Sequence, residues 1–520
     1  MYKISLINHV YKNKLLVDFL KNKEEISSFH NGNSFESLNE NFLLNKEIST
    51  EKRKLLVEVI SNQYDSTKLS VPDNVIRLSK KGTYTITTGH QLCLFSGPQY
   101  FIHKIISIIK SSLELNKKYP NCHFVPLFWM ASEDHDFEEI SSIKLFGKEL
   151  KVNDSFNKPV GELNPKVFSP VLNELKELLK NEPKSNELIK LFSDSFNQSS
   201  WSNATRFYLH QLFGKYGLVV LDANDKILKD SFASIMKKEI DNQFIYNSVI
   251  DSNSKILEKG YKPTINPREL NLFYLNKDSR DRIIFSNDDF TIGNKKYSLK
   301  ELEKAIDNNP ELFSPNVLMR PVFQEFILPN VAYIGGPSEL TYWLQLKQCF
   351  ECVNLEYPLL ILRDHFSWID SKSISWWKDQ GFSIDDLFQS FDSLIRKDAK
   401  ANDIFHFDKE KEMFNQLSIS INDKSKSIDS SFEKSANASL KNMEKELIRI
   451  ENKILKAFKT KNQNKINKIQ KIQSKLINNG VLKERVENFI VPFLNSKDDY
   501  FDKLLETSDI NTPTLKILTY

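Results

Sequence analysis

Cysteine is scarce in this sequence, with four residues in a chain of 520. So few thiols do not form a disulfide framework in a protein of this length, and their scarcity favours a reducing compartment. Long hydrophobic runs are missing as well, since no window reaches the roughly 18 uninterrupted apolar residues of a membrane span. The first residues also lack the apolar core and the cleavage site of a signal peptide. We therefore expect a cytoplasmic protein with no membrane partner.

An excess of one charge sign is missing too. The chain holds 72 Lys and Arg residues against 68 Asp and Glu residues, a formal net charge of +4. A balance this close is not typical of a general nucleic-acid-binding protein, so we expect no nucleic-acid partner. Neither a Walker A sequence nor a GxGxxG fingerprint is present. With 40% hydrophobic residues, however, the chain can build sizeable cores, and its length predicts more than one domain.

The stretch from Thr83 to Glu139 predicts a βαβ unit. A short apolar run, Tyr84–Thr87, is typical of a buried strand. It leads through a polar turn and Gly97-Pro98 into a segment with apolar residues at helical spacing, and a second apolar strand follows over His123–Trp129. Ligands in open α/β sheets bind beyond the carboxyl ends of the strands, so the polar loops after both strands should face one crevice. That crevice is the candidate ligand site.

The sheet pattern returns in the second half of the chain. An extended stretch from Asn316 leads to a strand over Val331–Ile334, a Gly-Gly-Pro turn, and a helix with Glu339 in its first turn. Pro358–Leu362 is a further strand. Two Gly-Pro turns into helices, one in each half, predict a single doubly wound sheet with a switch point. The residues between them hold one more strand, Gly217–Asp222, and two insertions, the second of which is rich in short strands.

After about residue 385 the sequence takes on the pattern of a coiled coil. Apolar residues step by three and four positions in a heptad seam, at Leu440, Met443, Leu447, Ile450, Ile454 and Ala457. Between Lys441 and Lys475 there are 11 basic and three acidic residues. A Lys-rich outer face of this kind is commonly solvated, so we expect a helical hairpin or a dimer contact rather than a nucleic-acid site.

Two loops carry the candidate chemistry, and each has a structural alternative. Thr88–Pro98 is either an anion- or nucleotide-binding loop, in which N–H groups at a helix start meet a phosphate or carboxylate, or an ordinary strand-to-helix connection. The cluster Glu133–Glu139 holds five carboxylates and one imidazole. Such a cluster binds a divalent metal or supplies a general base beside a positioning acid, unless it is the acid-rich first turn of a helix capped by Ser132. The imidazole at a predicted strand end favours function.

Arg320, Gln324 and Arg363 lie near predicted strand ends in the second half of the chain. Arginine at such a place suits recognition of a carboxylate or phosphate, although a surface ion pair is the alternative. Cys349 and Cys352 form a C-x-x-C pair late in a predicted helix, without the second pair of a zinc site. This placement favours a structural role for the two cysteines.

Four segments of the chain resemble the BshC cysteine ligase family of bacillithiol biosynthesis: TTGHQLCLFSGPQYFIHK, VPLFWMASEDHDFEEI, NVLMRPVFQEFILPNVAYIGGPSELTYWLQLK and LKERVENFIVPFLN. The resemblance implies a Rossmann-like core related to nucleotidyltransferases, two connecting insertions and an α-helical coiled coil used in dimerisation. It also implies a reaction that joins the carboxyl group of cysteine to the amino group of glucosaminyl-malate. The fold class expected is therefore α/β with an added coiled-coil domain.

The resemblance and the residue pattern together predict eight segments. They are an N-terminal helical segment (1–75), the first half of the core (76–140), a first insertion (141–210), a core strand and helix (211–235), a second insertion (236–315), the second half of the core (316–384), the coiled coil (385–485) and a C-terminal helical segment (486–520).

The candidate site is taken from three loops that the resemblance carries over and from polar residues near them. The catalytic candidates are His135, Asp134, Asp136 and His90, the last at a position where the family often has Gln. The binding candidates are Thr88, Gly89, Gln91, Ser96, Gly97, Pro98, Ser132, Glu133, Arg320, Gln324, Gly335, Gly336, Pro337, Glu339 and Arg363.

A carboxylate does not condense with an amine unassisted, and this constrains the expected mechanism. We expect an activated cysteine, such as an adenylate or a phosphate ester, with ATP as the activating cofactor and no metal assigned. His135, backed by Asp134 or Asp136, would deprotonate the attacking amine. The 89–98 turn would hold the activating phosphates or the malate carboxylate, and Arg320 or Arg363 would meet a carboxylate. A KMSKS-like loop is not found, which leaves room for a different activated donor.

Two other classes of function stay open at this point. A metal-dependent hydrolase would use Asp134, His135 and Asp136 as metal ligands. A non-enzymatic scaffold would rely on the coiled coil and form a stable dimer without binding a small molecule. The ligase, too, is expected to be a homodimer through its coiled coil.

Overall fold

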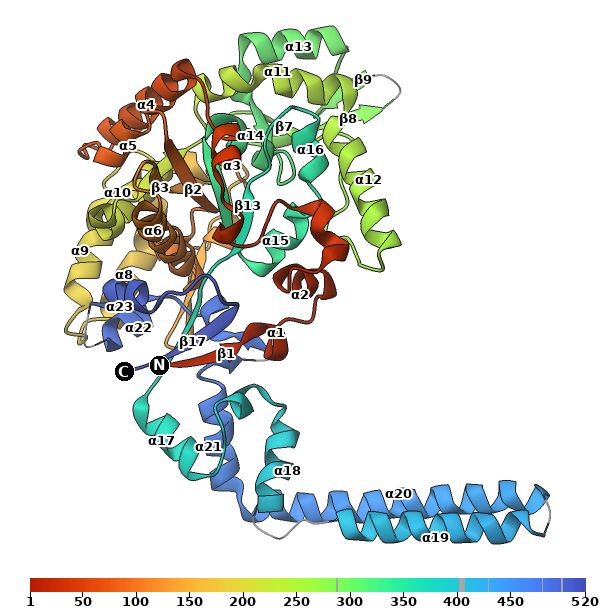
Figure 1. Ribbon diagram of the computed structural model, residues 1–520. Helices are drawn as coiled ribbons and strands as arrows, with labels where there is room; N and C mark the ends of the chain where they lie inside the picture. The colour runs from red at the N-terminus through yellow and green to blue at the C-terminus, as the bar shows by residue number, and fades with distance from the viewer. Residues whose placement is uncertain (287–288, 402–406, 429, 479, 497–498) are drawn as a thin grey trace.

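The computed structural model describes residues 1–286, 289–401, 407–428, 430–478, 480–496 and 499–520. An α/β body contains both ends of the described chain, and a long helical arm extends away from it (Figure 1). None of the helices among these residues combines the length and the hydropathy that crossing a membrane requires.

A five-stranded parallel sheet forms the centre of the body. Its strands are β2 (Thr83–His90), β3 (His123–Met130), β6 (Val219–Asp222), β12 (Asn330–Gly335) and β13 (Leu359–Leu362). Their order is β13-β12-β2-β3-β6. The strand order therefore reverses beside β2, which confirms the doubly wound sheet and places its switch point between β2 and β12.

The strands are almost wholly buried because both faces of the sheet are covered, and β3 and β13 read as continuous apolar runs. On β3, Phe124 and Phe128 pack in one hydrophobic core with helix α6 (Tyr100–Lys118). Val125 and Leu127 point to a second core. That core also contains residues of α4 (Thr50–Asp65), α11 (Lys226–Asn242) and α14 (Arg320–Ile327).

Two insertions interrupt the sheet. The first contains β4 (Ser142–Leu145), β5 (Lys148–Lys151), α8 (Ser169–Leu178), α9 (Ser185–Ser195) and α10 (Trp201–Phe213). The second contains α12 (Phe244–Glu258), β7 (Leu272–Leu275), β8 (Arg280–Ser286), β9 (Asp289–Ile292), β10 (Lys295–Tyr297), α13 (Leu299–Asn308) and β11 (Phe313–Pro315). Its strands form an antiparallel sheet in the order β10-β9-β8-β7-β11. This β-rich insertion forms one wall of the cavity described below.

The prediction of an extended stretch after Asn316 was wrong, because much of it is helix α14. The Asn316 side chain accepts hydrogen bonds from the backbone N–H groups of Leu318 and Met319, which turns the chain. Pro321 then lies in the first turn of the helix, where its missing N–H leaves no bond unmade. Arg320 and Gln324 therefore lie on a helix rather than at strand ends.

The two terminal segments, predicted as helical, each contain a strand as well. Strands β1 (Tyr2–Ser5), β17 (Thr514–Thr519) and β14 (His365–Ile369) form a separate sheet in the order β1-β17-β14. The first and last described residues consequently lie close together (Figure 1). The helices of these segments are α1 (Leu6–His9), α2 (Lys14–Leu20), α3 (Glu40–Asn45), α4, α5 (Asp73–Arg77), α22 (Ile490–Asn495) and α23 (Tyr500–Thr507). In the core, short helices α15 (Pro337–Trp343) and α16 (Lys347–Glu351) follow β12.

The arm is a helical hairpin, one of the two uses expected for the heptad seam. Helices α19 (Asp408–Lys426) and α20 (Ser430–Lys461) lie side by side (Figure 1). Helices α17 (Ser371–Asp379), α18 (Phe391–Ala401) and α21 (Gln463–Gln473) connect them to the body. Along the seam Leu440 is buried, whereas Met443 and Ile450 are each 49% exposed. The hairpin thus leaves part of its apolar surface uncovered.

Candidate functional site

A cavity of about 1060 Å³ opens at the carboxyl ends of the central strands, at the switch point. Its walls come from the loops after β2, β3 and β12, from α6 and α14, and from the β-rich insertion. One further wall residue, Arg485, comes from the C-terminal part of the chain. The volume suits a ligand of the size of a nucleotide or a substituted sugar.

A largely buried ion pair closes the switch point between β2 and β12. The Lys104 Nζ on α6 donates to the Gly89 carbonyl at 2.8 Å and lies 2.6 Å from Glu339 Oε2. Glu339 also accepts hydrogen bonds from the Tyr333 hydroxyl at 2.6 Å and the Gly336 N–H at 2.8 Å. Burial would raise the pKa of Glu339, but Lys104 and these donors outweigh it and lower that pKa to about 2. The pair fixes the turns after both strands.

His135 and Asp134 form an acid–base pair on the cavity wall. The His135 Nδ1 lies 3.6 Å from Asp134 Oδ1, and the His135 side chain is 40% exposed. Asp134 itself is held by Gln91 Nε2 at 2.6 Å, by the His135 backbone N–H at 2.8 Å and by Arg280 Nη1 at 3.4 Å. An imidazole that faces a cavity and is backed by a fixed carboxylate suits a general base.

Of the other acids in the cluster, Asp136 and Glu133 make contacts that stabilise the fold, whereas Glu139 lines the cavity. Asp136 caps α7 (Phe137–Ile140) by accepting the Glu139 N–H at 3.2 Å, and it does not line the cavity. The predicted cap, Ser132, instead donates from its buried hydroxyl to Asp222. Glu133 lines the cavity but is paired with Lys229 at 2.5 Å. Asp134 thus backs His135, and Asp136 does not.

The predicted metal ligands do not converge. The Asp134 carboxylate accepts hydrogen bonds from Gln91 and Arg280, while the carboxylate of Asp136 caps a helix. Among the residues that the structure describes, there is no group of three His, Cys, Asp or Glu side chains placed to hold a metal ion. The geometry therefore offers no support for a metal-dependent hydrolase built on this cluster.

His90 lines the cavity with both ring nitrogens engaged. Its Nδ1 lies 3.0 Å from the Gln91 carbonyl, to which it donates, and its Nε2 accepts from the Tyr100 hydroxyl at 3.1 Å. Burial, with a smaller effect from Lys104, lowers the pKa of His90 to about 4. The ring is therefore neutral at physiological pH and fixes the turn after β2. A catalytic role for His90 stays a prediction.

The second half of the predicted anion-binding loop lies away from the cavity. Gly97 has a φ of +60°, and its carbonyl accepts a hydrogen bond from the Asn488 side chain at 2.6 Å. Ser96 is buried, and Pro98 forms a β-bridge with Asn488. Helix α6 begins two residues after Pro98, at Tyr100. This part of the loop holds the C-terminal segment against the body.

The remaining binding candidates divide between wall and core. Those on the cavity wall are Gly89, Gln91, Arg320, Gly336, Pro337, Glu339 and Arg363. Thr88, Gly335 and Gln324 are buried behind it, with the Thr88 hydroxyl donating to the Ile334 carbonyl at 2.7 Å. Arg320 is bonded to Gln324 Oε1 at 3.2 Å, and the ion pairs of the described residues do not include it. Its charge is available for an anionic ligand.

Sequence reasoning missed Tyr100, Lys104, Arg280 and Arg485, all of which line the cavity. The sequence could have indicated Lys104, because it is a single Lys within the apolar run of α6 and is buried there. Buried lysines seldom lack a function or a partner. Arg280 stacks over Phe273 at 4.1 Å in the β-rich insertion. No pattern in the sequence shows that this insertion folds over the switch point.

Comparison with known proteins decides the family. The chain matches the family model "Bacillithiol biosynthesis BshC, N-terminal Rossmann-like domain" over residues 2–364. It matches "Bacillithiol biosynthesis BshC, C-terminal coiled-coil domain" over residues 366–520. The chain belongs to the BshC family. The resemblance seen in the four sequence segments, and the fold that it implied, are thereby confirmed.

Two curated BshC relatives align along nearly the whole chain, and a third aligns along about seven tenths of it. The protein is 36% identical over 534 residues to one from Flavobacterium psychrophilum, covering 98% of each chain. It is 36% identical to one from Flavobacterium johnsoniae, covering 95% of each, and 29% identical to one from Staphylococcus carnosus, covering 71% of each. Each of these relatives bears the name "Putative cysteine ligase BshC". The BshC domains meet at residues 364–366, beside Arg363.

Proposed function

We propose that this BshC protein is a cysteine ligase that joins the carboxyl group of cysteine to the amino group of glucosaminyl-malate. Its family belongs to bacillithiol biosynthesis, and its relatives carry the ligase name. The observation that carries the proposal is the His135–Asp134 pair on the wall of a cavity that also holds Arg320 and Arg363. Such a cavity offers a base for an amine and cations for carboxylates.

The amine of glucosaminyl-malate attacks only when it carries no proton. As the new C–N bond forms, the bond between the cysteine carbonyl carbon and its activating group breaks and that group leaves with its electron pair. The nitrogen must also lose a proton, and His135 accepts it. Asp134, fixed by Gln91 and Arg280, stabilises the imidazolium that results. The proton later leaves His135 for solvent, which reaches the half-exposed ring.

Binding of the substrates falls to the cations of the wall. Arg320 is free of ion pairs in the described part of the chain, so it meets a carboxylate or a phosphate. The turn Gly89–Gln91 and Arg320 would hold ATP, which when bound supplies the activation of the cysteine carboxyl group. These residues fit an anionic cosubstrate, because they offer it the backbone of the turn and a guanidinium that joins no ion pair among the described residues.

The test is mass spectrometry of the protein incubated with cysteine, glucosaminyl-malate and ATP, with each omitted in turn. The expected product has the mass of bacillithiol and requires all three. Product without ATP would retain the ligase and reject ATP as the energy source. No product under any of these conditions, from folded protein, would contradict the proposed ligase.

We also propose a homodimer formed through the helical hairpin. A groove between α19 and α20 is lined by Met413, Phe414, Leu417, Met443, Leu447 and Ile450. Three of these side chains, Met413, Met443 and Ile450, are 49% exposed or more. Covering this apolar groove with the hairpin of a second copy would complete the heptad seam.

A further inference from the structure

A buried carboxylate joins the C-terminal part of the chain to the cavity. Glu484 lies in the short helical turn η9 (Lys483–Arg485) and is fully buried. Its oxygens accept from Arg363 Nη2 at 2.7 Å and Nη1 at 3.2 Å. They also accept from His103 Nδ1 at 2.8 Å and His365 Nδ1 at 2.6 Å. Three elements of the body therefore meet on one side chain.

The charges in this cluster balance. Burial would raise the pKa of Glu484, but Arg363 and the two histidines outweigh it and hold that pKa well below its usual range. Burial lowers the pKa of His103, and burial with Arg363 lowers that of His365 to about 4. Both imidazoles are thus neutral at physiological pH and donate their Nδ1–H to the carboxylate. One cation and one anion remain, and neither tolerates loss of its partner.

The cluster leaves one donor of Arg363 without a partner, on a residue that lines the cavity. Two nitrogens of the guanidinium are occupied, because Nη1 also donates to the Asp364 carbonyl at 2.7 Å. The third, Nε, is buried and has no hydrogen-bond partner among the described residues. This nitrogen lies beside Gly336, 3.8 Å from the position that a Cβ atom would occupy if Gly336 carried a side chain. Arg363 and Gly336 both line the cavity.

Arg485, next to Glu484 in sequence, supplies a second cation beside the Tyr100 ring. The Cζ of Arg485 lies 5.6 Å from the centre of the Tyr100 ring, and the Cζ of Arg363 lies 5.2 Å from it. Arg485 lines the cavity, is exposed, and takes part in no ion pair between described residues. The turn that holds the buried anion thus also carries an available cation.

We infer that Glu484 is a positioning residue, which holds Arg363 so that its Nε–H meets an anionic group of a substrate while Arg485 binds the same group. The inference rests on the proposed function and deepens it. The group is a carboxylate, as in the malate part of the acceptor, or a phosphate, as in ATP. The C-terminal domain therefore completes a binding site whose other walls belong to the Rossmann-like domain.

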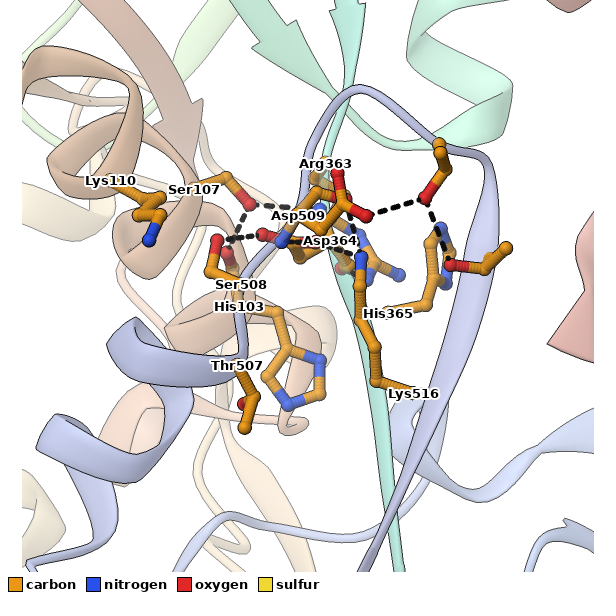
Figure 2. Close-up of polar contacts among 12 residues, drawn as sticks. His103, Ser107, Lys110, Arg363, Asp364, His365, Thr507, Ser508, Asp509 and Lys516 are labelled. Carbon is orange, nitrogen blue, oxygen red and sulfur yellow. Dashed lines mark hydrogen bonds and ion pairs between the residues drawn. The ribbon is translucent and has the colours of Figure 1, made fainter. Parts of the chain in front are cut away.

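A second buried ion pair provides a matched control. Asp364 and Lys516 are fully buried and bond to each other across the same two domains. Figure 2 shows how Ser107 on α6, Ser508 and Lys516 gather around Asp364, next to Arg363 in the chain. Neither Asp364 nor Lys516 lines the cavity. Breaking this pair removes a comparable buried bond between two side chains that do not line the cavity.

The experiment compares Glu484→Gln, Arg485→Ala and Asp364→Asn in the full-length protein. We expect Glu484→Gln and Arg485→Ala to raise KM for one anionic substrate about tenfold or more, with a smaller change in kcat, because a charge-assisted bond is lost. Asp364→Asn should lower the melting temperature but leave every KM near the wild-type value. Combining Arg363→Lys with Glu484→Gln should add little to either change, since Glu484 acts through Arg363.

Calorimetry with L-malate and with ATP separates the two sources of the anion and needs no ligation. If Arg485→Ala binds L-malate more weakly than the wild type does, the anionic group at this site is a carboxylate. If it binds ATP more weakly, the group is a phosphate. If wild-type protein makes no bacillithiol, the proposed function fails, while this binding comparison still tests the inference. Unchanged KM and unchanged binding of both probes in Arg485→Ala and Arg363→Lys would overturn it, even if Glu484→Gln does not fold.

Discussion

His135 is the residue on which the proposed chemistry depends most directly. Replacing it with Ala removes the proton acceptor, so kcat for ligation should fall about 10²- to 10⁴-fold. Asp134→Asn should also lower kcat, because the amide cannot stabilise the imidazolium. Asp136→Asn should stay near the wild-type rate, since Asp136 caps α7 outside the cavity. Steady-state assays on folded variants measure all three, with exposed Glu138→Gln as the control. A His135→Ala variant that keeps the wild-type rate would contradict the role of His135 as the general base.

Buried histidines predict a loss of stability in acid. His30 is buried against Phe19, has no hydrogen-bond partner in the described structure, and has its pKa lowered to about 4 by burial and by Lys347. Below the ordinary pKa of about 6.5, His30 binds a proton in the unfolded chain but stays neutral in the folded protein. This residue's contribution is therefore complete above pH 6.5 and is lost as the pH falls toward 4.

The variant His30→Leu tests this sign. The free energy of unfolding of the wild type should decrease between pH 6.5 and 4, by up to about 3 kcal/mol from this residue alone. His30→Leu should show a shallower decrease over the same range, measured by urea unfolding. His9→Leu, at a partly exposed histidine, is the comparison. Equal slopes for wild type and His30→Leu would contradict the prediction.

At this scale the sequence predicted residue types better than residue roles. Asp134 and Asp136 flank His135 and look equivalent in the sequence, yet one backs the imidazole and the other caps a helix. The difference depends on the direction in which the loop turns. Gln91 and Arg280, which are distant in sequence, fix that direction by bonding to Asp134. Such choices follow from tertiary contacts and leave no local pattern.

Among elements, the contact between α6 and the turn after β12 depends on Lys104 and Glu339. The pair is largely buried, so Lys104→Met should lower the free energy of unfolding by about 3–5 kcal/mol by leaving Glu339 uncompensated. The double variant Lys104→Met/Glu339→Gln should recover part of that loss, because no buried charge is then left alone. Chemical denaturation measures the cycle. Additive effects would show that the two charges do not interact.

The elements themselves were predictable where burial is complete. The five central strands are almost wholly buried, and β3 and β13 are apolar on both faces, so a buried sheet is clear from the sequence. Helix α14 was misread because a Pro near its start and a preceding Asn resemble a break. Strands β1 and β17 were missed because each is short and gains its partner from the opposite end of the chain. Pairings over such separations are invisible to local patterns.

For the whole molecule, the exposed groove of the hairpin predicts the oligomeric state. Replacing Met443 and Ile450 with Lys places charges in the proposed contact, so the protein should become monomeric. Light scattering after size-exclusion chromatography measures the mass. Ile419→Lys alters an exposed residue of α19 outside the groove and should leave a dimer intact. A wild-type monomer, or a dimer that survives both Lys substitutions, would reject the contact.

The sheet β1-β17-β14 has a consequence for how the protein is made. Lys3 and Asp509, which pair beside it, stand 506 positions apart, so β1 leaves the ribosome long before the strand that joins it to β14. Glu484 and Arg485 are also translated late. A nascent chain therefore carries a finished Rossmann sheet with an open cavity wall and two unpaired strand edges. The nascent protein should therefore gain ligand binding and resistance to proteases at the same time, when its last residues have been translated.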